Sequence, residues 1–123
     1  MPAFFIAEIE TTNATAMEPY RAAVPATIAQ YGGRFLIRGG ATELVEGGPE
    51  PKRVVILEFA DTAAAKRWYN SPEYQKILPI RLANSTGRAF IVEGASAKAA
   101  TAGAALPPPE RVALWEKAVL GAR

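Results

Sequence analysis

The sequence predicts an α+β domain whose main elements follow one another in the order β-α-β-β-α-β. The run Arg53–Phe59 is continuous in β-branched and apolar residues, which is typical of a buried strand. Apolar residues between Thr15 and Gln30 recur every three or four positions, which indicates an amphipathic helix. The pair Gly32-Gly33 ends that helix and introduces another strand.

The N-terminal half contributes two strands and a helix. Residues Phe4–Glu10 alternate between two faces, which predicts the first strand. The helix from about Thr15 to Gln30 is expected to kink or restart near Val24, because Pro25 lacks the amide that a helix needs. The second strand is expected from Arg34 to about Leu44, with a bulge or bend at Gly39-Gly40.

The C-terminal half of the domain repeats the pattern. A turn-rich loop over residues 46–51 leads into the third strand, Arg53–Phe59. A helix is expected from about Ala63 to Asn70, and Pro72 starts a further helical segment that runs towards Arg81. Residues Gly87–Glu93 form the fourth strand. This order is the ferredoxin-like, split βαβ arrangement.

Residues 1–95 are expected to form one domain, and residues 96–123 a linker and an added C-terminal helix. The stretch 95–105 contains mainly Ala, Ser, Thr and Gly, which is typical of a flexible linker. A short helix is expected from Glu110 to about Leu120. Because one helix on a linker cannot bury its own apolar stripe, it is expected to dock on its domain or on a partner chain.

Composition excludes several classes of function. The chain has no cysteine and no histidine, so it has no thiolate nucleophile, no Ser-His-Asp triad and none of the usual soft metal or haem ligands. We therefore expect no metal and no cofactor. The net charge is +2 and the basic residues are scattered, which argues against a nucleic-acid partner.

The chain also lacks the usual membrane signals. No apolar run reaches the length of a membrane span, and the start Met1-Pro2-Ala3-Phe4 lacks the pattern of a signal peptide. We therefore expect no membrane partner and a cytoplasmic location.

Four segments carry a resemblance to a known family: Tyr31–Gly40, Arg53–Phe59, Trp68–Gln75 and Arg88–Gly94. In order and spacing they resemble the small bacterial domain-of-unknown-function family thirteen-thirty, which belongs to the dimeric α+β barrel superfamily. The resemblance covers about residues 2–94 and implies a homodimer in which two sheets pack face to face. It implies no established reaction. Related superfamilies include haem enzymes and cofactor-free monooxygenases, and the absence of histidine excludes those that need it.

Strand alternation predicts two faces for the sheet. Glu8, Arg38 and Glu58 share a face with apolar neighbours, and this face is expected to meet the other subunit. The opposite face, which suits burial under two helices, carries Phe5, Ile9, Phe35, Ile37, Val55, Leu57 and Phe59.

Charged residues on a half-buried face need partners, since an unpaired buried charge is costly. In this fold the third strand lies between the first and the second, so Glu58 is expected between Glu8 and Arg38. One interpretation is an ion-pair cluster that fixes the strand register or the dimer. The other is an anion or carbonyl site built on Arg38, with Glu58 as the base.

Four further residues are candidates for ligand binding. Arg81 either joins Arg38 in selecting a carboxylate or phosphate, or pairs with Glu73 or another acid. Tyr20 either closes the pocket as a hydrogen-bond donor or packs on the sheet. Trp68 and Tyr74 are candidate wall residues, and a core role is the alternative for Trp68.

The sequence therefore predicts a homodimeric small-molecule-binding or accessory domain with an amphipathic, anion-selecting pocket. A small carboxylate or carbonyl compound is the expected ligand. One alternative is a cofactor-free isomerase or lyase that acts on such a compound. Another is a structural module that recruits a protein partner through its final helix.

Overall fold

The computed structural model describes residues 1–95, so the predicted linker and C-terminal helix lie outside the described residues. The elements are β1 (Ala3–Thr11), α1 (Ala14–Gln30), β2 (Arg34–Arg38), β3 (Arg53–Phe59), α2 (Thr62–Tyr69), α3 (Pro72–Asn84) and β4 (Ser85–Glu93). They confirm the predicted ferredoxin-like order, with the second helical region divided into α2 and α3. Each helix begins after a residue whose side-chain oxygen accepts a hydrogen bond from the backbone N–H three positions on: Asn13, Asp61 and Ser71.

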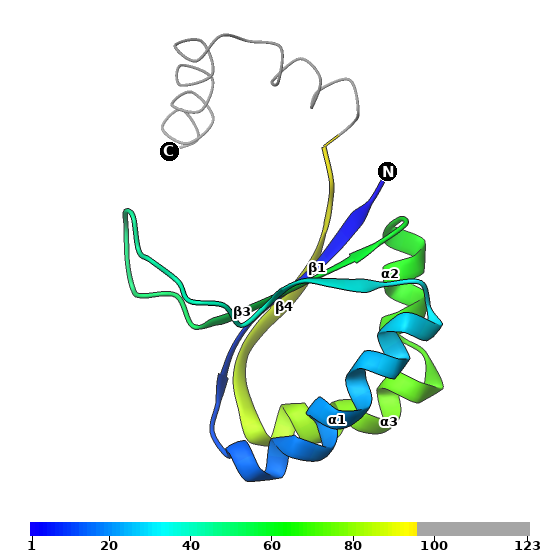
Figure 1. The fold of residues 1–123 in the computed structure, drawn as a ribbon, viewed down its shortest axis with the longest axis horizontal. Helices are drawn as coiled ribbons and strands as arrows, with labels where there is room; N and C mark the ends of the chain where they lie inside the picture. The colour runs from blue at the N-terminus through cyan, green and yellow to red at the C-terminus, as the bar shows by residue number, and fades with distance from the viewer. Residues whose placement is uncertain (96–123) are drawn as a thin grey trace, which may run out of the picture.

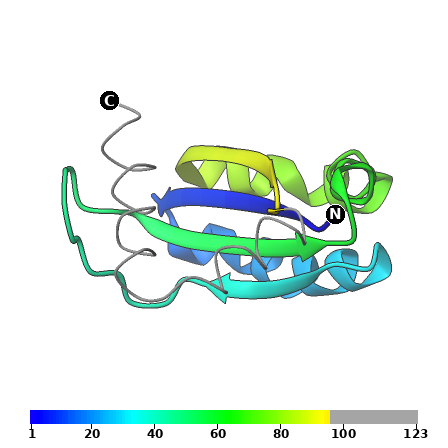
Figure 2. The ribbon, with the colours of Figure 1, turned by 90° about the horizontal axis from the view of Figure 1, so that it is seen from above.

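The strands form one antiparallel sheet in the order β2-β3-β1-β4. The third strand therefore lies between the first and the second, as predicted. The three helices of residues 1–95 cover the same face of this curved sheet (Figure 1). Figure 2 shows the strands from β4 (yellow) through β1 (blue) and β3 (green) to β2 (cyan).

The core lies between the sheet and the helices. Its largest fully buried side chains are Trp68, Tyr74, Phe59, Met17 and Ile28. The alternate residues of β1 and β3 that face the helices are buried too: Phe5, Ala7, Ile9, Leu57 and Phe59. The alternation read from the sequence is thus correct for these two strands.

The helix α1 is continuous through Pro19 and Pro25, so of the kink or restart predicted near Val24 the restart does not occur. Val24 and Ile28, on either side of Pro25, are both buried in the core. Their burial holds the two halves of the helix in one packed unit, although the proline removes an amide donor.

The second strand differs from the prediction in its length and in the place of its bulge. It ends at Arg38 instead of continuing to Leu44, because Gly39 turns the chain away with a φ of +72°. The bulge lies at Leu36, since Phe35 pairs with Leu57 while Ile37 pairs with Ile56.

This bulge reverses the faces of the next two residues. With one extra residue in β2, Ile37 lies opposite Ile56 on the face away from the helices, and Arg38 lies opposite Val55 on the helix-covered face. The predicted faces of Ile37 and Arg38 are therefore both wrong.

The face away from the helices is partly exposed and carries an apolar group of side chains beside the charged residues Glu8 and Glu58. The apolar group is made of Phe4, Ile6, Val54 and Ile56, and Phe90 and Val92 of β4 adjoin them. Ile37, Phe90 and Val92 are 42%, 40% and 41% exposed. We call this surface the open face. None of the helices described in residues 1–95 has the length and apolarity that crossing a membrane requires.

Candidate functional site

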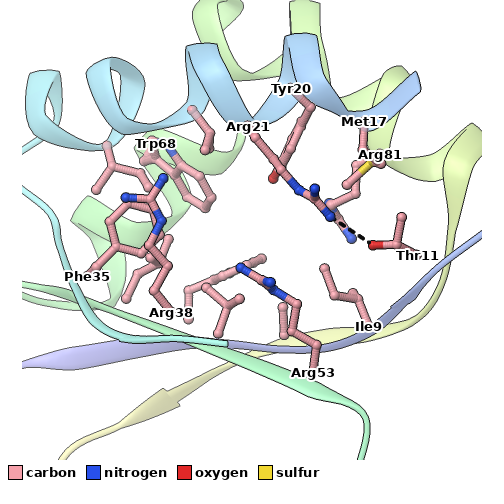
Figure 3. Close-up of a pocket in the computed structure, with 16 residues that line it drawn as sticks. Ile9, Thr11, Met17, Tyr20, Arg21, Phe35, Arg38, Arg53, Trp68 and Arg81 are labelled. Atoms are coloured by element: carbon pink, nitrogen blue, oxygen red, sulfur yellow. Dashed lines mark hydrogen bonds between the residues drawn. The ribbon is translucent and has the colours of Figure 1, made fainter. Parts of the chain in front are cut away.

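A pocket lies between α1 and the helix-covered face of the sheet (Figure 3). It contains about 610 Å³ of space free of atoms, including open solvent at its mouth. Most of its wall is apolar and comes from β1, β3 and α1: Phe5, Ala7, Ile9, Val55, Leu57, Val24 and Ile28.

Four arginines from four different elements also line this pocket: Arg21 of α1, Arg38 of β2, Arg53 of β3 and Arg81 of α3. No aspartate or glutamate of residues 1–95 lines it. The one ion pair that any of the four makes within the described residues joins Arg21 to Glu18 at 3.7 Å, and Arg21 also donates a hydrogen bond to Thr11 Oγ1 at 3.4 Å (Figure 3). The pocket is therefore strongly positive.

Sheet register places two of these arginines close together. Arg53 lies opposite Ile9, and Arg38 lies opposite Val55, two residues further along β3. A Cβ atom on Gly39 would lie 2.5 Å from the Cζ of Arg53, so the glycine leaves room for this guanidinium. Both arginines have exposed side chains and line the mouth of the pocket.

The guanidinium of Arg38 lies over the ring of Phe35, with its Cζ atom 4.3 Å from the ring centroid. A planar guanidinium on an aromatic face is held by cation–π attraction while its N–H donors stay free. Arg38 thus lines this pocket on the helix-covered face and not on the face that we predicted.

Arg81 is the buried member of the group, with only 7% of its surface exposed. Its Nε donates a hydrogen bond to the Tyr74 hydroxyl at 3.3 Å. Burial opposes the charged form of Arg81, but the neighbouring hydroxyls of Tyr74 and Tyr20 outweigh burial and raise its pKa. Arg81 also lines the pocket, and none of its guanidinium nitrogens is a fully buried atom without a partner.

Tyr20 points from α1 into the pocket, as Figure 3 shows. Its hydroxyl is hydrogen bonded to that of Tyr74, with 2.8 Å between the oxygens. Burial, followed by the proximity of Tyr74, raises the pKa of Tyr20. Tyr20 is therefore neutral at physiological pH. Tyr74 itself has no exposed surface and lies behind the pocket wall.

Trp68 belongs both to the core and to the pocket wall. It is 1% exposed, and its Nε1 donates to Thr27 Oγ1 at 3.0 Å. Its ring packs against Phe5 and Tyr74, with centroids 5.0 and 4.1 Å away. Both readings of this residue hold at once, because the buried indole also lines the pocket.

Glu58 does not join this pocket, so the predicted contact between Arg38 and Glu58 is wrong. Glu58 accepts a hydrogen bond from Arg34 Nε at 2.7 Å on the opposite face of the sheet. Its neighbours in the register are Phe4 and Arg34, and Glu8 lies further along, opposite Val54. The bulge at Leu36 explains the error, since it turned Arg38 to the other face.

The alternative pairing of Arg81 with Glu73 does not form either. Glu73 accepts hydrogen bonds from the Tyr31 hydroxyl at 2.8 Å and from Gln30 Nε2 at 3.1 Å. Its own backbone amide at the start of α3 and the bond from Tyr31 lower the pKa of Glu73.

Two pocket arginines were missed in the sequence, although each had a signal. Arg53 shares the alternation of Val55 and Leu57, which placed those two residues correctly on the helix-covered face. Arg21 adjoins Tyr20 and lies one helical turn before Val24 on the same stripe of α1. Among residues 1–95, no group of three or more acidic side chains is arranged to hold a metal ion.

Comparison with known proteins supports the fold. The profile of a domain of unknown function, DUF1330, matches residues 2–95. The RPA0582 protein of unknown function from Rhodopseudomonas palustris is similar, with TM-score 0.65, 19% identity and coverage of 77% of this chain and 83% of that one. SnoaB, a cofactor-independent oxygenase from Streptomyces nogalater, is similar with TM-score 0.56, 21% identity and coverage of 77% and 94%. No curated protein matches the chain.

Proposed function

The chain belongs to the DUF1330 family of domains of unknown function, and we propose that it binds a small amphipathic anion in the pocket beneath α1. One observation carries the proposal: four arginines and no carboxylate of residues 1–95 line that pocket. No carboxylate balances these charges in the lining of the pocket, and a bound anion would accept hydrogen bonds from the guanidinium groups.

The pocket wall also limits the kind of anion. Apolar side chains of β1, β3 and α1 make up most of the lining, so an inorganic ion would leave that surface in contact with water. A carboxylate attached to a flat apolar body fits both parts of the lining. The carboxylate oxygens would meet the paired donors of the guanidinium groups, and the apolar body would lie against Phe5, Leu57 and Trp68.

The titratable groups of the pocket support a binding function better than a proton-transfer reaction. The isomerase or lyase alternative relied on Glu58 as the base, and Glu58 lies on the other face of the sheet. The side chains that titrate in the pocket are the four arginines and Tyr20, none of which is a base near neutral pH. SnoaB is a cofactor-independent oxygenase, but its likeness to this chain supports a common fold alone.

We also propose that the protein is a homodimer joined through the open face. Ile56 lies near the centre of this face, opposite both Ile6 and Ile37. The exposed apolar side chains of β2 and β4 extend the patch across the sheet, and a contiguous apolar patch of this kind is uncommon on a monomer. A second copy of the same face would cover it.

Binding is tested with 1-naphthoate and its neutral counterpart 1-naphthalenemethanol by calorimetry. We expect wild type to prefer the acid, and Arg53→Gln or Arg38→Gln to weaken naphthoate binding by about 10-fold or more with little effect on the alcohol. Arg67→Gln is the matched control, because Arg67 is exposed on α2 and does not line the pocket. Equal binding of acid and alcohol would refute an anion-selecting pocket.

The dimer is tested by sedimentation of the full chain at micromolar concentration. We expect a dimer for wild type and a monomer or an unfolded chain for Ile56→Asp, because the substitution places a charge at the centre of the open face. Lys66→Asp is the control, because Lys66 is exposed on α2, and this variant should leave the dimer intact. A folded wild-type monomer would contradict the proposal.

A further inference from the structure

We propose that Arg81, Tyr74 and Tyr20 form a directed hydrogen-bond chain that presents the Tyr20 hydroxyl proton to the ligand, so that the pocket selects molecules with an acceptor oxygen beside Tyr20. This inference rests on the proposed binding function and adds a specificity-determining residue to it.

The direction of the chain follows from counting donors and acceptors. Arg81 can only donate, so the Tyr74 oxygen is the acceptor of the 3.3 Å bond from Arg81 Nε. Tyr74 has no exposed surface, and its hydroxyl proton therefore needs an acceptor within the protein. Among residues 1–95 the one acceptor in reach is the Tyr20 oxygen, 2.8 Å away.

The opposite direction leaves a buried proton without a partner. If Tyr20 donated to Tyr74, the Tyr74 oxygen would accept two hydrogen bonds while its own proton pointed into the core. An unsatisfied donor at a fully buried position is costly, so the arrangement in which Tyr74 donates is favoured.

Tyr20 then has its oxygen engaged and its proton free. Its ring lines the pocket, and Figure 3 shows its hydroxyl turned into the space between α1 and the sheet. Burial keeps this hydroxyl protonated by raising its pKa, so it acts as a donor over the whole physiological range of pH. Donation from Tyr74 also polarises it, as in any chain of hydrogen bonds that starts at a cation.

The ligand feature that this chain recognises is an oxygen with a free lone pair, in a ketone, an ester or a carboxylate. A neutral pair of probes separates this effect from the arginines: 1-acetylnaphthalene carries one acceptor oxygen, and 1-ethylnaphthalene has a similar shape without it. Their affinities are measured for the full chain by displacement of 8-anilinonaphthalene-1-sulfonate fluorescence.

We expect wild type to prefer the acetyl probe and Tyr20→Phe to reduce that preference by about 3- to 10-fold, the contribution of one neutral hydrogen bond. Tyr74→Phe should reduce the preference by a smaller factor, because Tyr20 keeps its proton but loses its orientation. Tyr31→Phe is the matched control, since the Tyr31 hydroxyl donates to Glu73 away from the pocket.

Two results would overturn the inference while leaving anion binding in place. One is an unchanged preference in Tyr20→Phe. The other is a stronger preference in Tyr74→Phe, because that variant would release the Tyr20 proton if Tyr20 were the donor. Failure of both probes to displace the dye from wild type would instead refute the pocket, and the inference would fall with it. Circular dichroism of each variant confirms that it is folded.

Discussion

Replacing Arg81 by methionine should destabilise the ligand-free protein and weaken its preference for anions. Arg81 is 7% exposed and has no acidic partner within residues 1–95. Burial opposes its charge, but the Tyr74 and Tyr20 hydroxyls outweigh burial and raise its pKa, so the folded protein favours the charged guanidinium. Methionine keeps a flexible apolar stem of similar length and removes the charge.

The expected size of the effect comes from two opposing contributions. The variant loses the hydrogen bond from Nε to the Tyr74 hydroxyl, which as a bond from a charged donor is worth about 1.5–3 kcal/mol. It also removes the desolvation cost of the cation, which is the smaller contribution, because the neighbouring hydroxyls outweigh burial in raising the pKa of Arg81. We expect a net loss of about 1 kcal/mol, which lowers the melting temperature of a domain of this size by about 4–8 °C.

Thermal unfolding of both proteins at the same concentration measures this effect, and calorimetry with 1-naphthoate measures the loss of binding. Arg67→Met is the control, because the same chemical change at an exposed position of α2 should alter neither quantity. If Arg81→Met left the melting temperature unchanged or raised it, the hydroxyls would not outweigh the cost of burying the charge, and a stabilising role for Arg81 would be refuted.

Three further predictions concern single residues. Gly39→Ala should lower the free energy of unfolding by about 1–2 kcal/mol because φ at Gly39 is +72°, and it should weaken naphthoate binding by displacing Arg53. Gly47→Ala is the control, since Gly47 has a φ of +77° and open space around it. Thermal unfolding and calorimetry should show the loss of stability for this variant and no loss of binding. The raised pKa of Tyr20 implies stability that is complete below pH about 10 and lost at higher pH, so Tyr20→Phe should flatten alkaline unfolding curves. The lowered pKa of Glu73 implies stability that is present above pH about 4.3 and lost as the pH falls, so Tyr31→Phe should lessen the acid sensitivity seen in urea titrations at pH 7 and pH 3.

Alternation and helical periodicity sufficed to predict the fold because each reports burial directly. The faces of β1 and β3 follow from Phe5, Ile9, Leu57 and Phe59, which are large, apolar and buried. The start of α3 followed from Pro72, because the first position of a helix needs no amide donor. The length of β2 did not follow, because residues 39–44 have no alternation strong enough to show where pairing stops.

The site was harder to predict than the fold because it depends on which side chains converge in space. Arg81 and Tyr20 were candidates by residue type, but their link through Tyr74 joins residues 54 and 7 positions apart in the chain. Helical spacing could not show it, since Tyr20 lies on α1 and the other two on α3. We assigned Glu58 to the pocket because we predicted the strand order correctly but the register of β2 wrongly.

The site depends on the bulge at Leu36, and no residue type in this segment predicts a bulge at that position. It inserts one residue opposite Ile56, so Arg38 enters the pocket and Ile37 enters the open face. Exchanging the two side chains, Ile37→Arg with Arg38→Ile, tests this register. Given the bulge, the exchanged chain carries its charge on the open face, so it should lose naphthoate affinity by about 10-fold or more and dimerise less well. With regular alternation, the exchange would instead bring an arginine into the pocket, and unchanged or tighter binding would refute the register.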